Sequence, residues 1–286
     1  MADFSPLLEW WATEGRDLPW RRTRDPWAVL VSELMLQQTQ VPRVVDRWRP
    51  FLDRFPEPAT CAAAPPGDVV AAWRGLGYNR RAINLHRAAT DVVARHDGRI
   101  PDDLDALLAL PGIGPYTARA VLVFAYGRDL GLVDTNAGRF LARAGSGQAL
   151  GRRSAQDLAD GLVPPGQGWA WGQAVFDLGA LVCTRARPAC GRCPVATSCA
   201  WNLAGRPEPD PVVGSAGIST PQSRFEGSDR QGRGRLVDAL RHGPVALTDL
   251  AMVAGWPGDD LRADRVGDGL VSDGLAVRDH CHLRLP

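Results

Sequence analysis

The chain has 286 residues, of which 45% are hydrophobic and 23% charged, and its formal net charge is +1. This composition is typical of a globular protein with a buried core, and the length allows two modest domains. No run of about 18 apolar residues occurs, which excludes a membrane-spanning helix, and the N-terminus lacks the pattern of a secretory signal. With so little net charge, any binding to a polyanion must depend on local patches and backbone donors.

The first 200 residues are predicted to be mostly helical. Apolar side chains recur at helical spacing at Trp27, Leu30, Val31 and Leu34, and Pro42 is expected to break this helix. Further helical patterns cover residues 43–54, 67–74, 80–95, 102–109, 115–126, 135–144, 154–162 and 169–182. Because alternating strand patterns are scarce, we predict an all-α domain over residues 1–200.

The C-terminal part of the sequence has a different composition. Residues 201–231 are rich in Pro, Gly and Ser, which is typical of a linker. Residues 232–286 recover helical patterns and end in two short strand-like pieces. Three helices and a small hairpin predict a winged-helix-like module in residues 232–286.

A glycine-rich turn, Leu110-Pro111-Gly112-Ile113-Gly114, joins two of the predicted helices. The glycines permit a tight turn, and the amides at the start of the next helix then point toward a phosphate. Pro111, Gly112, Ile113 and Gly114 are therefore predicted to grip DNA without reading its sequence. The alternative is a simple corner between two helices.

Two carboxylates are candidates for chemistry. Glu33 lies in an apolar helical stretch, where burial would favour the protonated form and allow it to donate a proton. Asp134 follows the glycine turn and directly precedes a helical pattern, where a carboxylate could stabilise positive charge at an anomeric carbon. The alternatives are a capping or salt-bridged role for Glu33 and a helix N-cap at Asp134.

Four of the six cysteines lie close together, at Cys183, Cys190, Cys193 and Cys199. In a cytosolic protein such crowding indicates metal or cluster ligation rather than disulfides. Zinc ribbons usually use two separate Cys-x2-Cys pairs, whereas this stretch has one pair with a single cysteine on either side. We predict a [4Fe–4S] cluster at residues 183–199, with zinc as the alternative.

Residues 1–200 resemble the helix-hairpin-helix DNA glycosylase superfamily in their hairpin, the following Asp and the terminal four cysteines. Within it, "PWAVLVSELMLQQTQV" (residues 26–41) and "GLGYNRRAINLH" (residues 75–86) are similar to the A/G-mismatch adenine glycosylases of the MutY type. The resemblance implies a six-helix lobe over residues 22–133 and a cluster lobe formed by residues 1–21 and 134–200. It also implies double-stranded DNA with a mismatched or damaged base as the partner.

The resemblance further implies roles for particular side chains. Glu33 would protonate nitrogen 7 of adenine, and Asp134 would face the oxocarbenium-like sugar. Arg21, Tyr116 and Asn136 match positions that line the pocket of the flipped base and support the two carboxylates. Residues that wedge into the duplex and touch the opposite base are matched by Gln38, Thr39, Leu76 and Tyr78.

The expected reaction is removal of adenine mispaired with 8-oxoguanine or guanine. Tyr116 stands where the bifunctional relatives keep a lysine, and the whole chain contains no lysine, so a Schiff base with the sugar is excluded. We therefore predict a monofunctional glycosylase. The alternatives are a glycosylase for thymine or uracil opposite guanine or for a deaminated purine, and a non-catalytic DNA-binding protein.

Two departures from the adenine glycosylases leave the opposite-base preference open. Their full-length members carry a Nudix-like C-terminal domain that inspects 8-oxoguanine, and residues 232–286 are too short to form it. Their usual Tyr-Tyr pair is Tyr78-Asn79 in this sequence. We expect a monomer in the bacterial cytoplasm, associated with the nucleoid and without membrane contact.

Overall fold

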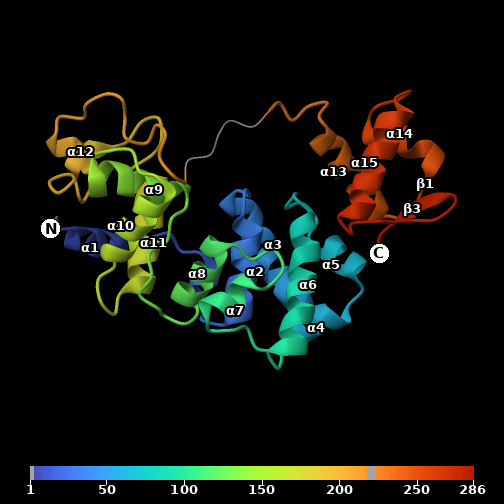
Figure 1. The fold of residues 1–286 in the computed structure, drawn as a ribbon, viewed down its shortest axis with the longest axis horizontal. Coiled ribbons are helices and arrows are strands. Elements are labelled where there is room, and N and C mark those ends of the chain that lie inside the picture. Colours follow the sequence, from blue (N-terminus) through green and yellow to red (C-terminus); the bar gives the residue numbers. More distant parts are fainter. Residues whose placement is uncertain (1–2, 218–222) are drawn as a thin grey trace. The chain divides into compact units, whose positions relative to one another are not determined.

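The computed structural model describes residues 3–217 and 223–286, which form two compact units (Figure 1). Of the described residues, the first unit contains 3–29, 102–104 and 114–217, and the second contains 30–101, 105–113 and 223–286. Both units are discontinuous in sequence, since the chain passes between them repeatedly.

The first unit is built around α11 (Gly168–Leu181), a helix that is apolar on most sides and therefore buried. It packs against α1 (Ser5–Glu14), α8 (Pro115–Phe124) and α9 (Thr135–Phe140). A Cβ atom on Gly179 would lie 2.8 Å from the Cα atom of Asn136, so this glycine allows α9 to approach α11 closely. The other helical elements are η1 (Pro19–Arg22), the π-helix η2 (Leu141–Ser146), α10 (Arg152–Gly161), η3 (Cys190–Arg192) and α12 (Ala200–Leu203).

The second unit contains a helical part, in which α6 (Arg80–Arg95) packs against α4 (Pro58–Ala63) and α5 (Pro66–Ala72). The ring of Trp73 meets the ring of Phe51 edge-on at a centroid distance of 5.8 Å, and both side chains are buried. The other helices of this part are α2 (Pro26–Leu36), which begins in the first unit, α3 (Val41–Arg54) and α7 (Leu104–Leu108).

Residues 223–286, called the C-terminal module below, also belong to the second unit. Helices α13 (Asp229–Leu240), α14 (Leu250–Ala254) and α15 (Asp260–Ser272) pack on one another. Three short antiparallel strands follow the order β1-β3-β2, namely β1 (Val245–Ala246), β2 (Val277–Arg278) and β3 (His282–Arg284). The turn η4 (Leu247–Asp249) connects β1 to α14.

The C-terminal module is fastened to α5 and α6 by specific contacts. The amide of Gly67 donates to the carbonyl of Pro286 at 2.9 Å. Asp273 forms an ion pair with Arg80 at 3.4 Å. Figure 1 shows the module, in orange and red, beside the helical part of the same unit.

The predicted helical character of residues 1–200 is confirmed, and within the described residues strands occur in the C-terminal module alone. The expectation that Pro42 ends a helix is wrong. Helix α2 already ends at Leu36, because Gln38 adopts a left-handed φ of 54°. Pro42 lies in the first turn of α3, where its missing N–H has no helical partner to lose. Among the described residues, no helix is both long and apolar enough to cross a membrane.

Candidate functional site

The glycine-rich turn lies between α7 and α8, as the sequence predicts. Gly112 has a φ of 76°, and a Cβ atom there would come within 2.6 Å of the Cβ atom of Asn84 in α6. Gly114 differs, since its φ of −94° suits any residue and a Cβ atom there would meet nothing within 4 Å. Gly112 is therefore required by the fold, whereas Gly114 leaves open space at the N-terminus of α8.

Asp134 is the N-cap of α9. Its Oδ1 accepts hydrogen bonds from the amides of Asn136 at 2.8 Å and Ala137 at 2.7 Å, and its Oδ2 accepts one from the Asn136 side chain at 2.9 Å. The capping alternative is thus confirmed. The same bonds fix the orientation of the carboxylate, so a cap and a catalytic role are compatible.

The charge state of Asp134 is set by opposing effects. Burial raises the pKa of this carboxyl above its ordinary value of 3.8. The hydrogen bonds from Ala137 and Asn136, together with the positive charge of Arg139, act in the opposite direction without cancelling the effect of burial. The donors that surround Asp134 therefore favour its ionised form, although protonation begins at a higher pH than for an exposed aspartate.

Arg139 connects Asp134 to the cysteine-rich loop. Its Nη2 donates to Oδ1 of Asn136 at 2.7 Å and to the carbonyl of Gly179 at 2.6 Å. Its Nε donates to the carbonyl of Cys183 at 2.8 Å. A displacement of the loop at Cys183 would therefore reach Asn136, the residue that holds Asp134.

Two other predicted pocket residues lie in the first unit with Asp134. Arg21 forms a double hydrogen bond with Asp177, at 2.7 and 2.8 Å, and Asp177 is fully buried. Burial alone would raise the pKa of Asp177, but the bonds and charges of Arg21 and Arg16 hold it below its ordinary value. The Nε of Arg21 is buried without a hydrogen-bond partner among the described residues. Tyr116, in the first turn of α8, lies with its ring 6.3 Å from that of Phe176.

Glu33 lies in α2 and belongs to the second unit. Only 4% of its surface is exposed, and its helical neighbours Leu30 and Leu34 are also buried. The expected burial of this carboxyl is therefore confirmed. That Glu33 and Asp134 face the same nucleotide stays a prediction.

The four predicted wedge residues lie together in the second unit. Gln38, Thr39, Leu76 and Tyr78 all line one cleft. Thr39 Oγ1 donates to the carbonyl of Leu76 at 3.1 Å, which joins the two loops directly. Tyr78 has a φ of 44° and an exposed fraction of 44%, so it is held in an unusual backbone conformation with its ring accessible.

Arg81 holds these two loops in place. Its Nη1 donates to the carbonyls of Leu34 and Gln37, each at 2.6 Å, and its Nη2 donates to Thr39 Oγ1 at 2.9 Å and to the carbonyl of Gly77 at 3.0 Å. Burial lowers the pKa of Arg81 to about 10, which leaves the guanidinium charged at neutral pH. The end of the helix that carries Glu33 is thereby tied to the loop that carries Tyr78.

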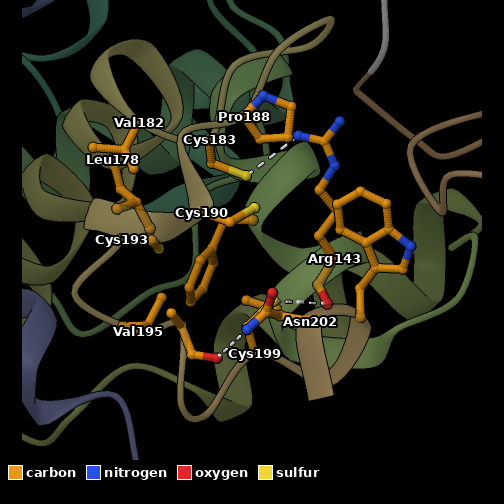
Figure 2. Close-up of a pocket in the computed structure, with 14 residues that line it drawn as sticks. Arg143, Leu178, Val182, Cys183, Pro188, Cys190, Cys193, Val195, Cys199 and Asn202 are labelled. Atoms are coloured by element: carbon orange, nitrogen blue, oxygen red, sulfur yellow. Dashed lines mark hydrogen bonds between the residues drawn. The ribbon is translucent and has the colours of Figure 1, made fainter. Parts of the chain in front are cut away.

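The four clustered cysteines meet at one pocket in the first unit (Figure 2). Cys183 follows α11, Cys190 begins η3, Cys193 is the C-cap of η3, and Cys199 is the N-cap of α12. Apolar side chains, among them Phe140, complete the lining. The structure therefore brings together all the ligands that the sequence predicts.

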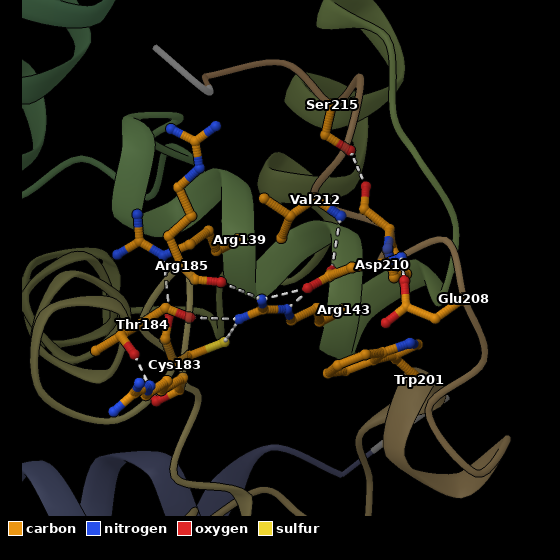
Figure 3. A network of polar contacts seen from close by, with 12 residues as sticks. Arg139, Arg143, Cys183, Thr184, Arg185, Trp201, Glu208, Asp210, Val212 and Ser215 are labelled. Atoms are coloured by element: carbon orange, nitrogen blue, oxygen red, sulfur yellow. Dashed lines mark hydrogen bonds and ion pairs between the residues drawn. The ribbon is translucent and has the colours of Figure 1, made fainter. Parts of the chain in front are cut away.

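Arg143 lies against this pocket and is almost completely buried (Figure 3). Its Nη1 is 3.5 Å from Sγ of Cys183 and donates to the carbonyl of Thr184 at 2.7 Å. It is also paired with Asp210, and its guanidinium lies 5.1 Å from the ring centroid of Trp201. A fixed positive charge of this kind is suited to a site that gathers thiolates.

Zinc and [4Fe–4S] sites require different arrangements of the four cysteines. A zinc ion requires its ligands to converge on one point, at about 2.3 Å from each sulfur. No group of three or more His, Cys, Asp or Glu side chains in the described part of the chain is arranged to hold a metal ion, so the choice between zinc and a cluster stays a prediction. A [4Fe–4S] cluster uses one cysteine for each iron, so its four sulfurs surround a pocket rather than a point.

Sequence reasoning missed four residues that hold the site, namely Arg81, Arg139, Arg143 and Asp177. Most of their partners lie far away in sequence or are backbone carbonyls, and neither kind leaves a pattern in a single chain. Arg139 follows Asp134 by five residues, which was the one local signal that the two side chains could interact.

Comparisons with known proteins show the family to which the chain belongs. Residues 31–165 match the family described as HhH-GPD superfamily base excision DNA repair protein. A relative named adenine DNA glycosylase, from Mycolicibacterium smegmatis, is 42% identical over 273 residues, with 94% of this chain and 90% of the relative covered. Most of the C-terminal module therefore lies within that alignment.

Other similar proteins act on a different base. A thymine/uracil-DNA glycosylase from Pyrobaculum aerophilum is 39% identical over 201 residues, which cover 67% of this chain and 87% of the relative. The solved structure of a thermostable thymine-DNA glycosylase has a TM-score of 0.65 and 29% identity, covering 70% of this chain and 94% of the other. Both comparisons leave about a third of this chain unmatched.

The two glycines of the turn should respond differently to substitution. Gly112→Ala should lower the free energy of unfolding by about 1–3 kcal/mol, because the new Cβ atom is strained at this φ and collides with Asn84. Gly114→Ser should change it by less than about 0.5 kcal/mol, since the site is open and serine is a good N-cap. Chemical denaturation of both variants measures the difference, and equal losses would contradict it.

Proposed function

Because the chain belongs to the helix-hairpin-helix superfamily of base excision DNA repair proteins, and within it to the adenine DNA glycosylases, we propose that it hydrolyses the N-glycosidic bond of adenine mispaired with 8-oxoguanine or guanine. The observation that carries this proposal is the similarity to an adenine glycosylase along nearly the whole chain, including most of the C-terminal module. The substrate is double-stranded DNA, and the enzyme acts as a monomer on the bacterial nucleoid.

Glu33 is the proton donor in this proposal. Adenine is a poor leaving group until a ring nitrogen is protonated. A carboxylic acid withdrawn from water favours its neutral form, which can donate that proton. The burial of Glu33 in the apolar helix α2 supports this role. Nitrogen 7 of the flipped adenine receives the proton, and the glycosidic bond weakens.

Asp134 stabilises the positive charge that then develops on the sugar. Its carboxylate is held by three hydrogen bonds before any substrate binds, so it needs no reorganisation during the reaction. Arg21, Tyr116 and Asn136 line and support this pocket, and the unpartnered Nε of Arg21 supplies a donor. Without lysine the chain has no amine side chain to attack the sugar, so the product is an intact strand with an abasic site.

The hairpin binds the DNA backbone. Residues 111–114 precede α8, whose N-terminal amides and helix dipole favour a phosphate. Open space at Gly114 permits this close approach. Gln38, Thr39, Leu76 and Tyr78 insert at the lesion, where an apolar or aromatic wedge offsets a few kcal/mol (roughly) of lost stacking.

A [4Fe–4S] cluster is held by Cys183, Cys190, Cys193 and Cys199. The convergence of these residues on one pocket, beside the buried cation of Arg143, supports this ligand set. When bound, the cluster supplies four metal–thiolate bonds that cross-link the loop. Arg139 and Arg143 hold the same loop against α9 and η2, so the cluster's role is to support the position of Asp134.

The C-terminal module is winged-helix-like in our proposal. Its element order of helix, strand, two helices and two strands, with a three-stranded antiparallel sheet, supports this assignment. Removal of thymine or uracil opposite guanine is the second candidate function, favoured by the similarity to the Pyrobaculum aerophilum enzyme.

Glu33→Gln should abolish adenine release while DNA binding changes little, because glutamine cannot donate the proton. Single-turnover assays test both the residue and the substrate. The duplexes pair adenine with 8-oxoguanine or guanine, pair thymine or uracil with guanine, or contain hypoxanthine. Wild-type activity in this variant would refute the acid role. Preferential release of thymine from T:G by the parent enzyme would favour the second candidate.

The rate of adenine release should fall at acidic pH as Asp134 becomes protonated. Since burial raises its pKa above 3.8, this fall occurs at a higher pH than for an ordinary aspartate. Asn136→Ala removes a donor that favours the ionised form, so the acidic limb should move to higher pH by about one unit. Profiles of the rate against pH for the parent, Asn136→Ala and the control Thr135→Ala give the pH at which the rate falls. An unchanged pH in Asn136→Ala would contradict the role of Asp134.

The purified protein should be brown and contain about four iron atoms per chain. Cys190→Ser should lose most of the broad visible absorbance, because one ligand of the cluster is missing. Cys281→Ser should keep it, since this exposed cysteine lies outside the pocket. Metal analysis and visible spectra check both variants, and a colourless protein with one zinc would overturn the cluster assignment.

A further inference from the structure

A cleft of about 970 Å³ lies inside the second unit, with walls from distant parts of the chain. One wall consists of the loop after α2, residues 37–43, and of residues 76–84 before and at the start of α6. The other wall is contributed by the C-terminal module, mainly by residues 223–237. The loop that carries Tyr78 therefore faces the C-terminal module.

The charge of the cleft favours an anion. Five arginines line it, namely Arg43, Arg80, Arg81, Arg230 and Arg233. Among the described lining residues Asp273 is the one acid, and it is already paired with both Arg80 and Arg233. The net positive charge is therefore suited to phosphate groups.

Two accessible aromatic rings line the same cleft. Tyr78 is 44% exposed and comes from the first wall, while Phe225 is 58% exposed and comes from the C-terminal module. The guanidinium of Arg230 lies 5.9 Å from the ring centroid of Phe225. Exposed aromatic rings among arginines are suited to stacking on a nucleobase, which is worth about 1–3 kcal/mol per base.

One buried arginine joins the two walls. Arg241 of α13 donates to the carbonyl of Val70 at 3.1 and 3.2 Å and, at 2.9 Å, to Oδ1 of Asn79. Asn79 directly follows Tyr78. The bond from Arg241 therefore fixes the residue that directly follows Tyr78.

We propose that residues 223–237 form the second wall of a DNA-binding cleft whose first wall is the loop of Tyr78, and that Arg241, through Asn79, holds the two walls together. The ligand is a nucleotide of the bound DNA, with its base against Tyr78 and Phe225 and its phosphates near Arg43 and Arg230. This inference rests on the proposed function and assigns part of its substrate surface to the C-terminal module.

The walls are tested by binding to a duplex whose mispaired adenosine carries a non-hydrolysable carbocyclic sugar. Phe225→Ala should weaken binding about tenfold through lost stacking, without changing the salt dependence. Arg230→Gln should weaken it about three- to tenfold and reduce the slope of log K against log salt by about 0.9. The control Arg265→Gln removes an exposed charge of the same module outside the cleft and should bind like the parent.

The hydrogen bond between Arg241 and Asn79 is tested by substitution of each residue. Arg241→Met and Asn79→Leu should each weaken binding, and the double variant should be no weaker than the worse single variant, because both remove one interaction. Asn79→Gln keeps a carbonyl acceptor without adding charge and should bind more tightly than Asn79→Leu. Thermal unfolding identifies any variant that fails to fold, and the exposed Phe225 and Arg230 keep the test independent of Arg241.

Adenine release by the parent enzyme distinguishes failure of this inference from failure of the proposed function. If the parent releases adenine and both Phe225→Ala and Arg230→Gln retain the parent's affinity and salt slope, the cleft does not bind DNA and the inference is overturned. If the parent releases no adenine from any mispair, the proposed function fails. Weaker DNA binding by the two wall variants would then still assign the cleft to DNA.

Discussion

Buried guanidinium groups that donate to backbone carbonyls hold the functional loops of this protein. A guanidinium has five donors in a rigid fork, and a charge buried without partners is costly. Arg81, Arg139 and Arg143 therefore need several acceptors each, and irregular loops are the segments with unused carbonyls. Each arginine fixes such a loop: residues 34–39 and 76–78 around Arg81, and the cysteine-rich loop around the other two. Because the chain contains no lysine, every long basic side chain is an arginine and can donate several hydrogen bonds in this way.

The same interaction explains why the cysteine-rich loop and Asp134 are structurally one feature. Asp134 is oriented by Asn136, Asn136 accepts from Arg139, and Arg139 donates to the carbonyl of Cys183. Burial raises the pKa of Asp134, so its ionisation depends on keeping every donor in place. The cluster proposed for this loop would thus support the carboxylate of Asp134 through these contacts, without electron transfer.

Sequence patterns predicted what depends on local chemistry. The helices, the glycine turn, the burial of Glu33 and the grouping of four cysteines follow from periodicity, backbone freedom and ligand spacing. Helix ends were less predictable. The residue with left-handed φ after α2 is Gln38, whereas glycine is the residue that usually signals this conformation in a sequence. The short helix α4, with its capping box from Glu57 to Thr60, is too brief for periodicity to show. The roles of Arg81 and Arg241 could not be predicted from the sequence, because most of their acceptors lie in segments that meet only after folding.

The C-terminal module also could not be placed from sequence, which suggested a linker and a separate domain. A domain of about 60 residues buries only about 60% of its unfolded surface and is marginal on its own. Contact with α5 and α6 adds to that burial. The approach at Gly67 is so close that a Cβ atom there would lie 2.5 Å from the carbonyl oxygen of Pro286, so this contact requires glycine. The module and these helices therefore form one compact unit.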